Sequence, residues 1–362
     1  METKNLKILF IPNWNVHHLP KDNPSIQAPD KYVDGEKYWF YKYFPEGTSV
    51  DILDIGKKSL IHWFEKKCHI YFLQPFKAFL KRNKYDIVIS HGAQSGLFYE
   101  LFSSFTKQKP QHLMFDIGGL NSSRVNLFEM SILRFILRKC PNIIVHSSAQ
   151  INFYKQHYPK QAPNVRFIPF GADIEYFNSY AIDSSNNTII AFGYAKRDYK
   201  TLCDAFCKIA NKDYKLHIIG DTRLANEYSE FKNIQFSSRL PLNQLIENVS
   251  KCAFVVIPLP EFMYSYGQMS ILQSMSMGKS LIITETTSTR DYISNAPGVI
   301  KTRPGNVEDM ANAIEQMINT PADERHRLGL ENLNYVKAHY NEKEMGNQIY
   351  EIVHDIFKKG MV

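Results

Sequence analysis

Short runs of apolar and β-branched residues alternate along this chain with stretches of helical periodicity, and this alternation limits the fold more than any other feature. A turn and a helix follow each run, as in a parallel sheet covered by helices on both faces. The sequence therefore predicts an α/β fold with two Rossmann-like, doubly wound domains. The runs occupy residues 7–12, 49–55, 85–90, 111–117, 142–148 and 165–170 in the first half and 188–194, 214–220, 233–238, 254–260 and 280–285 in the second.

A change in composition marks the boundary between the two sets of strands. After the run at 165–170 the chain passes through Gly171 and becomes polar from 183 to 187, as linkers do. The last stretch, about 341–362, has the pattern of an amphipathic helix that either closes the second domain or packs back on the first. We expect an N-terminal domain at 1–171, a linker at 172–186 and a C-terminal domain at 187–340.

Cysteine content and the first residues bear on the compartment. The five cysteines are scattered among apolar residues, which favours reduced thiols over a disulfide framework. Cys203 and Cys207 share an expected helix, but no histidine or further cysteine near them completes a zinc site, and we expect no metal. The start, METKNLKILFIPNW, lacks the apolar segment of a signal peptide, and no apolar run reaches the roughly 18 residues of a membrane span. We therefore expect a cytoplasmic protein.

The formal net charge of +7 suits nucleic acid, an anionic membrane or an anionic small molecule. Basic and aromatic residues are densest in LIHWFEKKCHIYFLQPFKAFLKRNK, residues 60–84. One interpretation is an ordinary surface helix of an α/β domain, broken near Pro75. The other is an interfacial helix on anionic lipid, which would place the protein at the inner face of the cell membrane.

A basic loop follows the first strand of the second half. Gly193 is succeeded by Lys196, Arg197 and Lys200 at the entrance of the helical stretch TLCDAFCKIA. Cationic side chains beside the free N–H groups of a helix start form an anion site, whereas the alternative is a solvated run of charge.

A second helix start lies in YSYGQMSILQSMSMGKSLII, residues 264–283. Gly267 precedes a helix whose first N–H groups, from Gln268 onwards, would face a ligand, and a glycine there would let a phosphate approach the backbone. Met269 is expected to point into the core from this helix. Gly278 ends the helix as its C-cap.

The order of motifs in the second half resembles the nucleotide-sugar-binding half of GT-B glycosyltransferases, specifically the retaining family 4. The resemblance covers about 165 to 350 and is carried by IPFGADIEYF, FGYAKRDYKTLCDAF, LHIIGD, LPLNQLIENVSKCAFVVIPLP, YGQMSILQSMSMGKSLIIT and RDYI. It implies two domains that face each other across a cleft, with a nucleoside diphosphate sugar on the second and an acceptor on the first. It also implies transfer with retention of configuration, without a cofactor or a metal.

The resemblance assigns donor-binding roles to several residues of this sequence. Arg197 takes the place of the family's phosphate-binding lysine, and Lys196 supplies a second charge because Tyr194 stands where a cation is usual. The family's paired glutamates fall near Ser265 and Gln273, neither of which is acidic, and Glu261 is out of register. Gln273 can still hydrogen-bond ribose hydroxyls. The full expected donor set is Gly193, Lys196, Arg197, Gly220, Arg239, Leu240, Tyr266, Gly267, Gln268, Met269 and Gln273.

On the acceptor side, His91 and Asp116 follow strands of the first half and are the candidate catalytic residues there, together with Arg197 at the donor. The alternative for His91 and Asp116 is a strand-end turn role. The function implied is a hexosyltransferase-like enzyme that acts on a glycan or lipid-linked acceptor in bacterial cell-surface polysaccharide synthesis. The alternatives are a GT-B epimerase or phosphorylase, a non-catalytic protein that binds sugar nucleotides, and a nucleic-acid binder, which the ordered loops disfavour.

Overall fold

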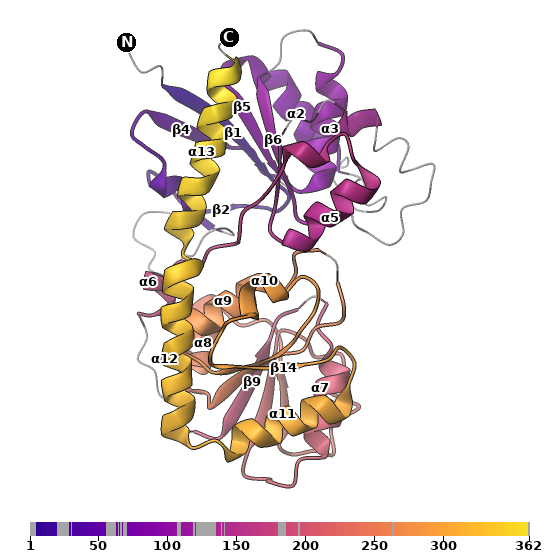
Figure 1. Ribbon diagram of the computed structural model, residues 1–362, viewed down its shortest axis with the longest axis vertical. Coiled ribbons are helices and arrows are strands. Elements are labelled where there is room, and N and C mark those ends of the chain that lie inside the picture. The colour runs from indigo at the N-terminus through magenta and orange to yellow at the C-terminus, as the bar shows by residue number, and fades with distance from the viewer. Residues whose placement is uncertain are drawn as a thin grey trace. The chain divides into compact units, whose positions relative to one another are not determined.

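The computed structural model describes residues 5–19, 29, 31–55, 63, 65, 67, 71–106, 110–118, 120, 135–138, 140, 142–179, 186–194, 196–262 and 264–360. The chain forms two units, one of Met1–Pro169 with Lys343–Val362 and one of Phe170–Glu342 (Figure 1). Among the described residues, no helix combines the length and the apolar character needed to cross a bilayer.

The first unit contains a six-stranded parallel sheet in the order β4-β1-β5-β6-β7-β8. Two short strands, β2 (His17–Leu19) and β3 (Lys31–Val33), pair separately. The sheet strands are β1 (Leu6–Pro12), β4 (Thr48–Ile52), β5 (Ile87–His91), β6 (Gln111–Asp116), β7 (Ile143–Val145) and β8 (Val165–Phe167).

Helices α2 (Leu73–Lys81), α3 (Ala93–Ser103) and α5 (Ser148–His157) pack on one face of this sheet, through Ala78, Tyr99 and Tyr154 among others. Pro75 lies in the first turn of α2, where a missing N–H costs nothing. The C-terminal helix α13 (Glu342–Gly360) runs beside the same sheet (Figure 1), and Tyr350 contacts Phe44, with ring centroids 5.1 Å apart.

The second unit has a six-stranded parallel sheet in the order β11-β10-β9-β12-β13-β14. The sequence predicted every strand of it except β14, an edge strand that mixes apolar and charged residues and so shows a weaker pattern than a buried strand. Its strands are β9 (Thr188–Phe192), β10 (Lys215–Ile219), β11 (Ile234–Ser237), β12 (Phe254–Ile257), β13 (Leu281–Thr284) and β14 (Val299–Thr302).

Alternate residues of these strands enter two separate cores, as a doubly wound sheet requires. Ile190 and Val255 face the core formed with α6 (Ile174–Phe177), α8 (Leu242–Lys251), α9 (Gln268–Ser276), α10 (Arg290–Ile293) and α12 (Ala322–His339). Ile189 and Val256 face the core formed with α7 (Tyr199–Cys207) and α11 (Val307–Asn319). The fold class predicted from the alternating runs is therefore confirmed in both units.

The stretch 172–186, predicted as a linker, includes α6. Ile174 and Phe177 of this helix are buried in the core of the second unit. Asp173 caps α6 by accepting a hydrogen bond from the Tyr176 amide. Apolar side chains at helical spacing thus draw part of the stretch into the fold, although the flanking residues are polar.

Candidate functional site

The candidate site of the second unit lies where its strand order reverses, between β9 and β12. These two strands are neighbours in the sheet. The segment after β9 leads to α7 on one face of the sheet, whereas residues 258–267 after β12 lead to α9 on the other face. Ligands of open α/β sheets collect at such a point, beyond the carboxyl ends of the strands. The two loops predicted to bind an anion, at 193–200 and 264–268, both start there.

Arg197 connects the two loops. Its Nη2 donates a hydrogen bond of 2.8 Å to Ser270 Oγ in the first turn of α9, and its Nε donates one of 3.3 Å to the Phe192 carbonyl at the end of β9. Gly193 has a φ of 127°, and a Cβ there would lie 2.7 Å from Arg197 Nε. Glycine at 193 thus allows the guanidinium to pass over the end of β9 and reach α9.

Aromatic side chains surround Lys196 near Arg197. Its Nζ hydrogen-bonds the Tyr264 hydroxyl and lies 4.9 Å from the ring centroid of Phe262 and 5.3 Å from that of Tyr266. The Arg197 guanidinium is 5.6 Å from the same Tyr266 ring. Two cations therefore share one aromatic ring, which holds both near the start of α9.

The N-terminus of α9 has backbone N–H groups without helical partners. Gly267 adopts a left-handed conformation with a φ of 85°, and its carbonyl accepts the first helical hydrogen bond, from the Ile271 amide. No described side chain caps this end, so the amides of 268–270 have no partner within the helix. The Gln268 side chain is buried, and its Nε2 has no hydrogen-bond partner in the described part of the chain. A buried donor of this kind is costly unless a ligand or water satisfies it.

One expectation about α9 needs correction, and for another the structure adds a second explanation. Met269 does not lie in the core as expected but is 42% exposed, because the helix turns Gln268 and Ile271 inward instead. Gly267 was expected to be glycine for the sake of an approaching phosphate, yet an added Cβ would meet Leu259 Cδ1 at 2.8 Å. The left-handed turn and the Leu259 contact already require glycine there.

The remaining expected donor residues lie on neighbouring strand ends. Gly220 has a φ of 108°, and a Cβ there would come within 3.2 Å of the Gly193 carbonyl oxygen, so these two turns touch. Arg239, after β11, stacks its guanidinium 4.6 Å from the ring centroid of Tyr194. Leu240 packs against the core beside it, while Gln273, on α9, is half-buried.

Acidic residues near these loops have other partners. Glu261 accepts a hydrogen bond of 2.8 Å from the Thr287 amide beyond β13. Asp221 accepts hydrogen bonds from Arg223, which lower the pKa of the Asp221 carboxyl group. Asp198 caps α7 by accepting hydrogen bonds from the Thr201 amide and hydroxyl. Among the described residues, Lys196, Arg197 and Arg239 therefore dominate the charge at this edge.

His91 occupies the corresponding reversal point of the first sheet, where β5 pairs with β1. Its ring is enclosed by Trp14 and Phe115, at centroid distances of 4.8 and 5.2 Å, and neither ring nitrogen has a partner in the described residues. Burial and the nearby His146 lower the pKa of His91 to about 3. The imidazole is therefore neutral near pH 7, and it can exchange hydrogen bonds with a hydroxyl but cannot act as a cation.

Both carboxylate oxygens of Asp116 accept hydrogen bonds. Its Oδ2 accepts a hydrogen bond of 2.9 Å from the Tyr154 hydroxyl, and its Oδ1 accepts one of 3.0 Å from the Gly118 amide. The Gln150 side chain donates to its backbone carbonyl. These contacts hold the turn after β6 against α5, and they favour the structural interpretation of Asp116 over the catalytic one.

His146 was not among the candidate residues chosen from the sequence, although it lies at the end of a strand. It directly follows β7, and its Nδ1–H donates a hydrogen bond of 2.7 Å to the Ile168 carbonyl. Burial lowers its pKa to about 4. Its place immediately after the run NIIV was the available signal, because polar residues at strand ends line the ligand-facing edge of such sheets.

Several solved structures match nearly the whole chain. A glycosyltransferase from Rickettsia africae ESF-5 has a TM-score of 0.73 at 15% identity, over 98% of this chain and 99% of the other. Sucrose-phosphate synthase from Thermosynechococcus elongatus has a TM-score of 0.70 at 14% identity, over 98% and 100%. Anabaena Alr3699/HepE in complex with UDP has a TM-score of 0.71 at 14% identity, over 97% and 100%. The chain therefore has the fold of the GT-B glycosyltransferases.

The second unit carries the family-level likeness. Residues 186–320 match the family described as glycosyl transferases group 1, whereas no curated protein matches the sequence. The matched region contains the basic loop after β9 and the start of α9. The GT-B fold expected from the ordered motifs is thus confirmed, and residues 186–320 are similar to the glycosyl transferases group 1.

Proposed function

We propose that this protein transfers a sugar from a nucleoside diphosphate sugar to a glycan or lipid-linked acceptor, with retention, in the synthesis of a bacterial cell-surface polysaccharide. The observation that carries the proposal is the 2.8 Å hydrogen bond from Arg197 to Ser270, because it brings a cation to a helix start whose amides have no helical partner. Anabaena Alr3699/HepE in complex with UDP and glucose shares the fold at 15% identity and supports this donor class.

The chemistry follows from where charge develops. When the sugar leaves, negative charge builds on the diphosphate, and fixed donors at that position stabilise the transition state. Arg197, Lys196 and the amides at the start of α9 supply positive charge and N–H groups there. The proposal therefore assigns stabilisation of the leaving group to side chains and backbone and requires no metal. The leaving phosphate accepts the acceptor proton, so no protein nucleophile is assigned.

The first unit is proposed to hold the acceptor. His91 is neutral and has no hydrogen-bond partner among the described residues, so a sugar hydroxyl at the carboxyl edge of β5 would satisfy a nitrogen that is otherwise buried and unpaired. Its role would be to orient a hydroxyl by hydrogen bonding. A change of its protonation state lies far below neutral pH and is not needed for that role.

Thermal unfolding with a panel of uridine, guanosine and adenosine diphosphate sugars tests the proposal. A bound donor at a hundred times its dissociation constant stabilises the folded state by about 2.7 kcal/mol. We expect one base class to raise the Tm of the protein, followed by turnover of that donor with a total glycan extract. The absence of stabilisation by every donor would contradict the proposal.

Two further functions have specific support or a specific test. The replacement of both expected glutamates by Ser265 and Gln273 favours a non-catalytic protein that binds sugar nucleotides, which would be stabilised by a donor but would not consume it with any acceptor. An epimerase or phosphorylase would change the donor without a glycan acceptor. Analysis of products from the donor alone and from the donor with glycan extract separates these three outcomes.

Gln273→Glu tests the ribose contact. If Gln273 binds ribose hydroxyls, a carboxylate is expected to preserve or strengthen donor binding, because charged acceptors form stronger hydrogen bonds. The opposing effect is repulsion from the diphosphate. Donor dissociation constants of Gln273→Glu and Gln273→Ala are compared, with Gln316→Glu on the exposed surface of α11 as the charge control. Equal loss of affinity in the two Gln273 variants would refute the ribose contact.

We also propose that the basic and aromatic stretch 60–84 docks on anionic lipid. Among its described residues, Trp63 is 62% exposed and Leu80 is 61% exposed. Lys67 lies over the Trp63 ring at 5.2 Å, and Lys77, on α2, is exposed near Phe76. Exposed apolar side chains among cations suit the boundary between headgroups and acyl chains. Leu60, Phe64 and Lys66 lie outside the described residues.

The docking proposal predicts sedimentation with anionic but not neutral vesicles at low salt, since each nearby Lys or Arg contributes about 1 kcal/mol at an anionic surface. Replacing Lys77, Lys81, Arg82 and Lys84 by Gln is expected to release the protein. The matched control replaces Lys208, Lys212, Lys232 and Lys251 of the second unit, all exposed. Equal sedimentation with neutral vesicles would contradict an electrostatic contribution to membrane binding. Sedimentation with neither would favour a soluble acceptor and the surface-helix interpretation.

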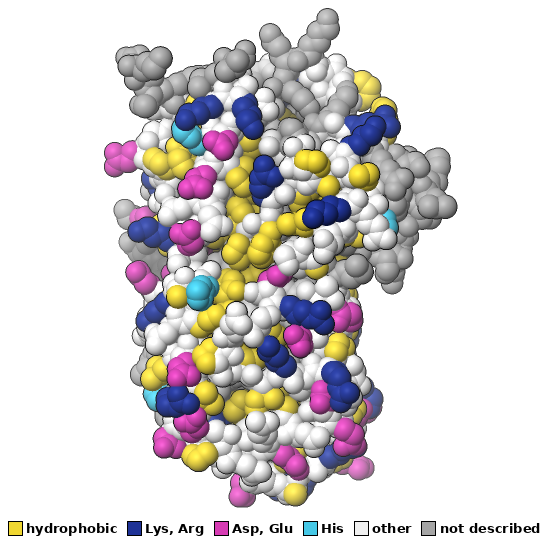
Figure 2. Space-filling view, in the orientation of Figure 1, with side chains coloured by type: hydrophobic (Ala, Val, Ile, Leu, Met, Phe, Trp, Pro, Cys, Tyr) yellow, Lys and Arg dark blue, Asp and Glu magenta, His cyan; other side chains and the backbone are white. Residues whose placement is uncertain are grey.

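The surface charge supports the absence of a nucleic-acid partner. On the face shown in Figure 2, Lys and Arg side chains are interspersed with Asp and Glu side chains. A nucleic-acid surface instead gathers cations along the path of the phosphates. Strong, salt-dependent binding to random duplex DNA would contradict this.

A further inference from the structure

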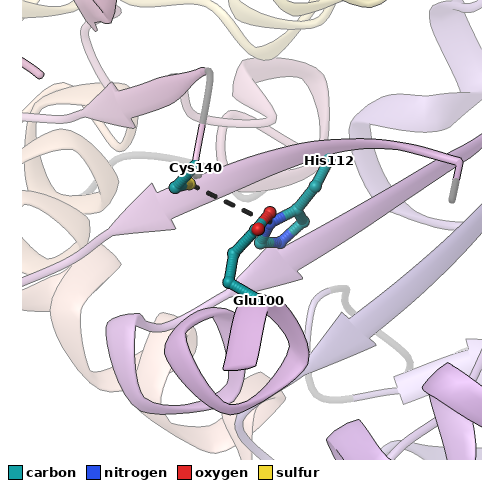
Figure 3. Close-up of side chains that lie close together, drawn as sticks. All are labelled: Glu100, His112 and Cys140. Carbon is teal, nitrogen blue, oxygen red and sulfur yellow. Dashed lines mark hydrogen bonds and ion pairs between the residues drawn. The ribbon is translucent and has the colours of Figure 1, made fainter. Parts of the chain in front are cut away.

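Three ionisable side chains converge in the interior of the first unit (Figure 3). Glu100 comes from α3, His112 from β6 and Cys140 from the segment before β7, and all three are at most 2% exposed. Their ligand atoms, one from each side chain, lie within 4.8 Å of one another. The three residues belong to separate elements, so no motif within a single stretch of sequence indicates the cluster.

The geometry of the cluster is convergent. Glu100 Oε1 lies 2.7 Å from His112 Nδ1, and Cys140 Sγ lies 3.9 Å from the same nitrogen. In a cysteine–histidine–carboxylate relay, the thiol and the carboxylate would bind opposite nitrogens of the ring. Here both approach Nδ1, so a nucleophilic triad is excluded, and the arrangement is instead one of three donors around a common point.

We propose that Glu100, His112 and Cys140 bind a divalent transition-metal ion, with zinc as the first candidate. Thiolate, imidazole and carboxylate are the ligands that zinc takes in proteins. Around a tetrahedral zinc ion the N–O and N–S separations would be about 3.3 and 3.6 Å, from usual bond lengths. The observed 2.7 Å is about 0.6 Å shorter and the observed 3.9 Å about 0.3 Å longer than these separations, so a bound ion would require the carboxylate to move slightly away from the ring.

The surroundings of His112 suit this role. Its Nε2 lies 2.9 Å from Ser90 Oγ, so a metal on Nδ1 would leave Nε2–H to donate to that hydroxyl. Such an outer hydrogen bond fixes the tautomer and orientation of a ligating histidine. Gly96 brings α3 close to the sheet, since a Cβ there would lie 2.6 Å from Ser90 Oγ. That close approach, one turn before Glu100, places the carboxylate at the imidazole.

Charge also favours the ion. A divalent cation with one thiolate and one carboxylate forms a neutral group, which is the state that a buried site tolerates best. Such an ion would join α3, β6 and the entry to β7, and its role would be structural. None of the three proposed ligands is assigned a role in sugar transfer, so the inference stands independently of the proposed function.

The full-length protein is reconstituted with zinc, desalted and analysed for metal by mass spectrometry. We expect about one zinc per chain in the wild type and in the control Cys207→Ser, and loss of zinc in Cys140→Ser and Glu100→Gln. Cys207 is a half-buried thiol in the second unit. Cobalt in place of zinc is expected to give a thiolate charge-transfer band in the near ultraviolet, absent from Cys140→Ser.

A second readout guards against unfolded variants. A chelator is expected to lower the Tm of the zinc-loaded wild type but not that of the wild type prepared without metal. Less than about a tenth of a zinc per chain after reconstitution would overturn the proposal. So would stoichiometric zinc that survives Cys140→Ser, because the ion would then be bound at another place.

Discussion

Replacing Arg197 by alanine is expected to lower the rate of sugar transfer by about a hundredfold, because removing a charge-assisted hydrogen bond to a leaving group costs roughly 2–4 kcal/mol. Arg197 reaches the first turn of α9 through Ser270 and lies over the ring of Tyr266. The positive charge is thus held at the place where the proposed diphosphate would gain negative charge. Steady-state rates with saturating acceptor measure the effect.

This change is also expected to lower the free energy of unfolding, but not enough to unfold the protein. Arg197→Ala removes hydrogen bonds to Ser270 and to the Phe192 carbonyl, each worth about 1 kcal/mol. Arg327→Ala is the control, since this exposed arginine of α12 pairs only locally, with Glu324 and Glu331, in the described contacts. Wild-type turnover in a folded Arg197→Ala protein would show that the diphosphate is placed wrongly.

Gly267→Val is expected to abolish donor binding. The residue has a φ of 85°, a conformation that a β-branched side chain avoids, and its Cβ would press on Leu259 Cδ1 at 2.8 Å. The turn would have to move, and with it the amides at the start of α9 that face the proposed diphosphate. Donor-induced stabilisation in thermal unfolding is the measurement.

The effect of backbone strain on stability has to be distinguished from a specific loss of donor binding. Gly305→Val supplies the control, because Gly305 also has a positive φ, of 66°, but a Cβ there meets nothing within 4 Å. Both variants are expected to lose stability, by about 1–3 kcal/mol of backbone strain. Only Gly267→Val should lose the response to donor. Undiminished donor affinity in that variant would remove the loop from the site.

The sequence was most informative about where the strands lie along the chain. Buried parallel strands are continuous apolar runs, and such runs are visible without knowledge of their partners, as at 188–194 and 254–260. The predicted runs at 142–148 and 165–170 are longer than β7 and β8, because their last residues form the loops beyond the sheet. The glycines that begin the basic loop and α9 were also recognisable from the sequence as turn residues, and the structure gives both a positive φ.

The sequence was less informative about where individual side chains point. Met269 was expected in the core and is exposed, while Gln268 beside it is buried, since the rotation of a short helix about its axis is set by packing rather than by its sequence pattern. In the sequence, Asp116 and His91 are both polar residues at the ends of strands. The structure distinguishes them, because Tyr154 and Gly118 satisfy Asp116, whereas no described residue pairs with the nitrogens of His91.

The sequence by itself determined that the chain alternates strands and helices in two sets, and which loops carry positive charge, because these properties are local. Only the tertiary structure decided which side chains meet. Arg197 and Ser270 are 73 positions apart, and Glu100, His112 and Cys140 come from three separate segments. Contacts of that kind depend on the order of strands in the sheet and on the close packing of helices against it, and no pattern within a single segment records them.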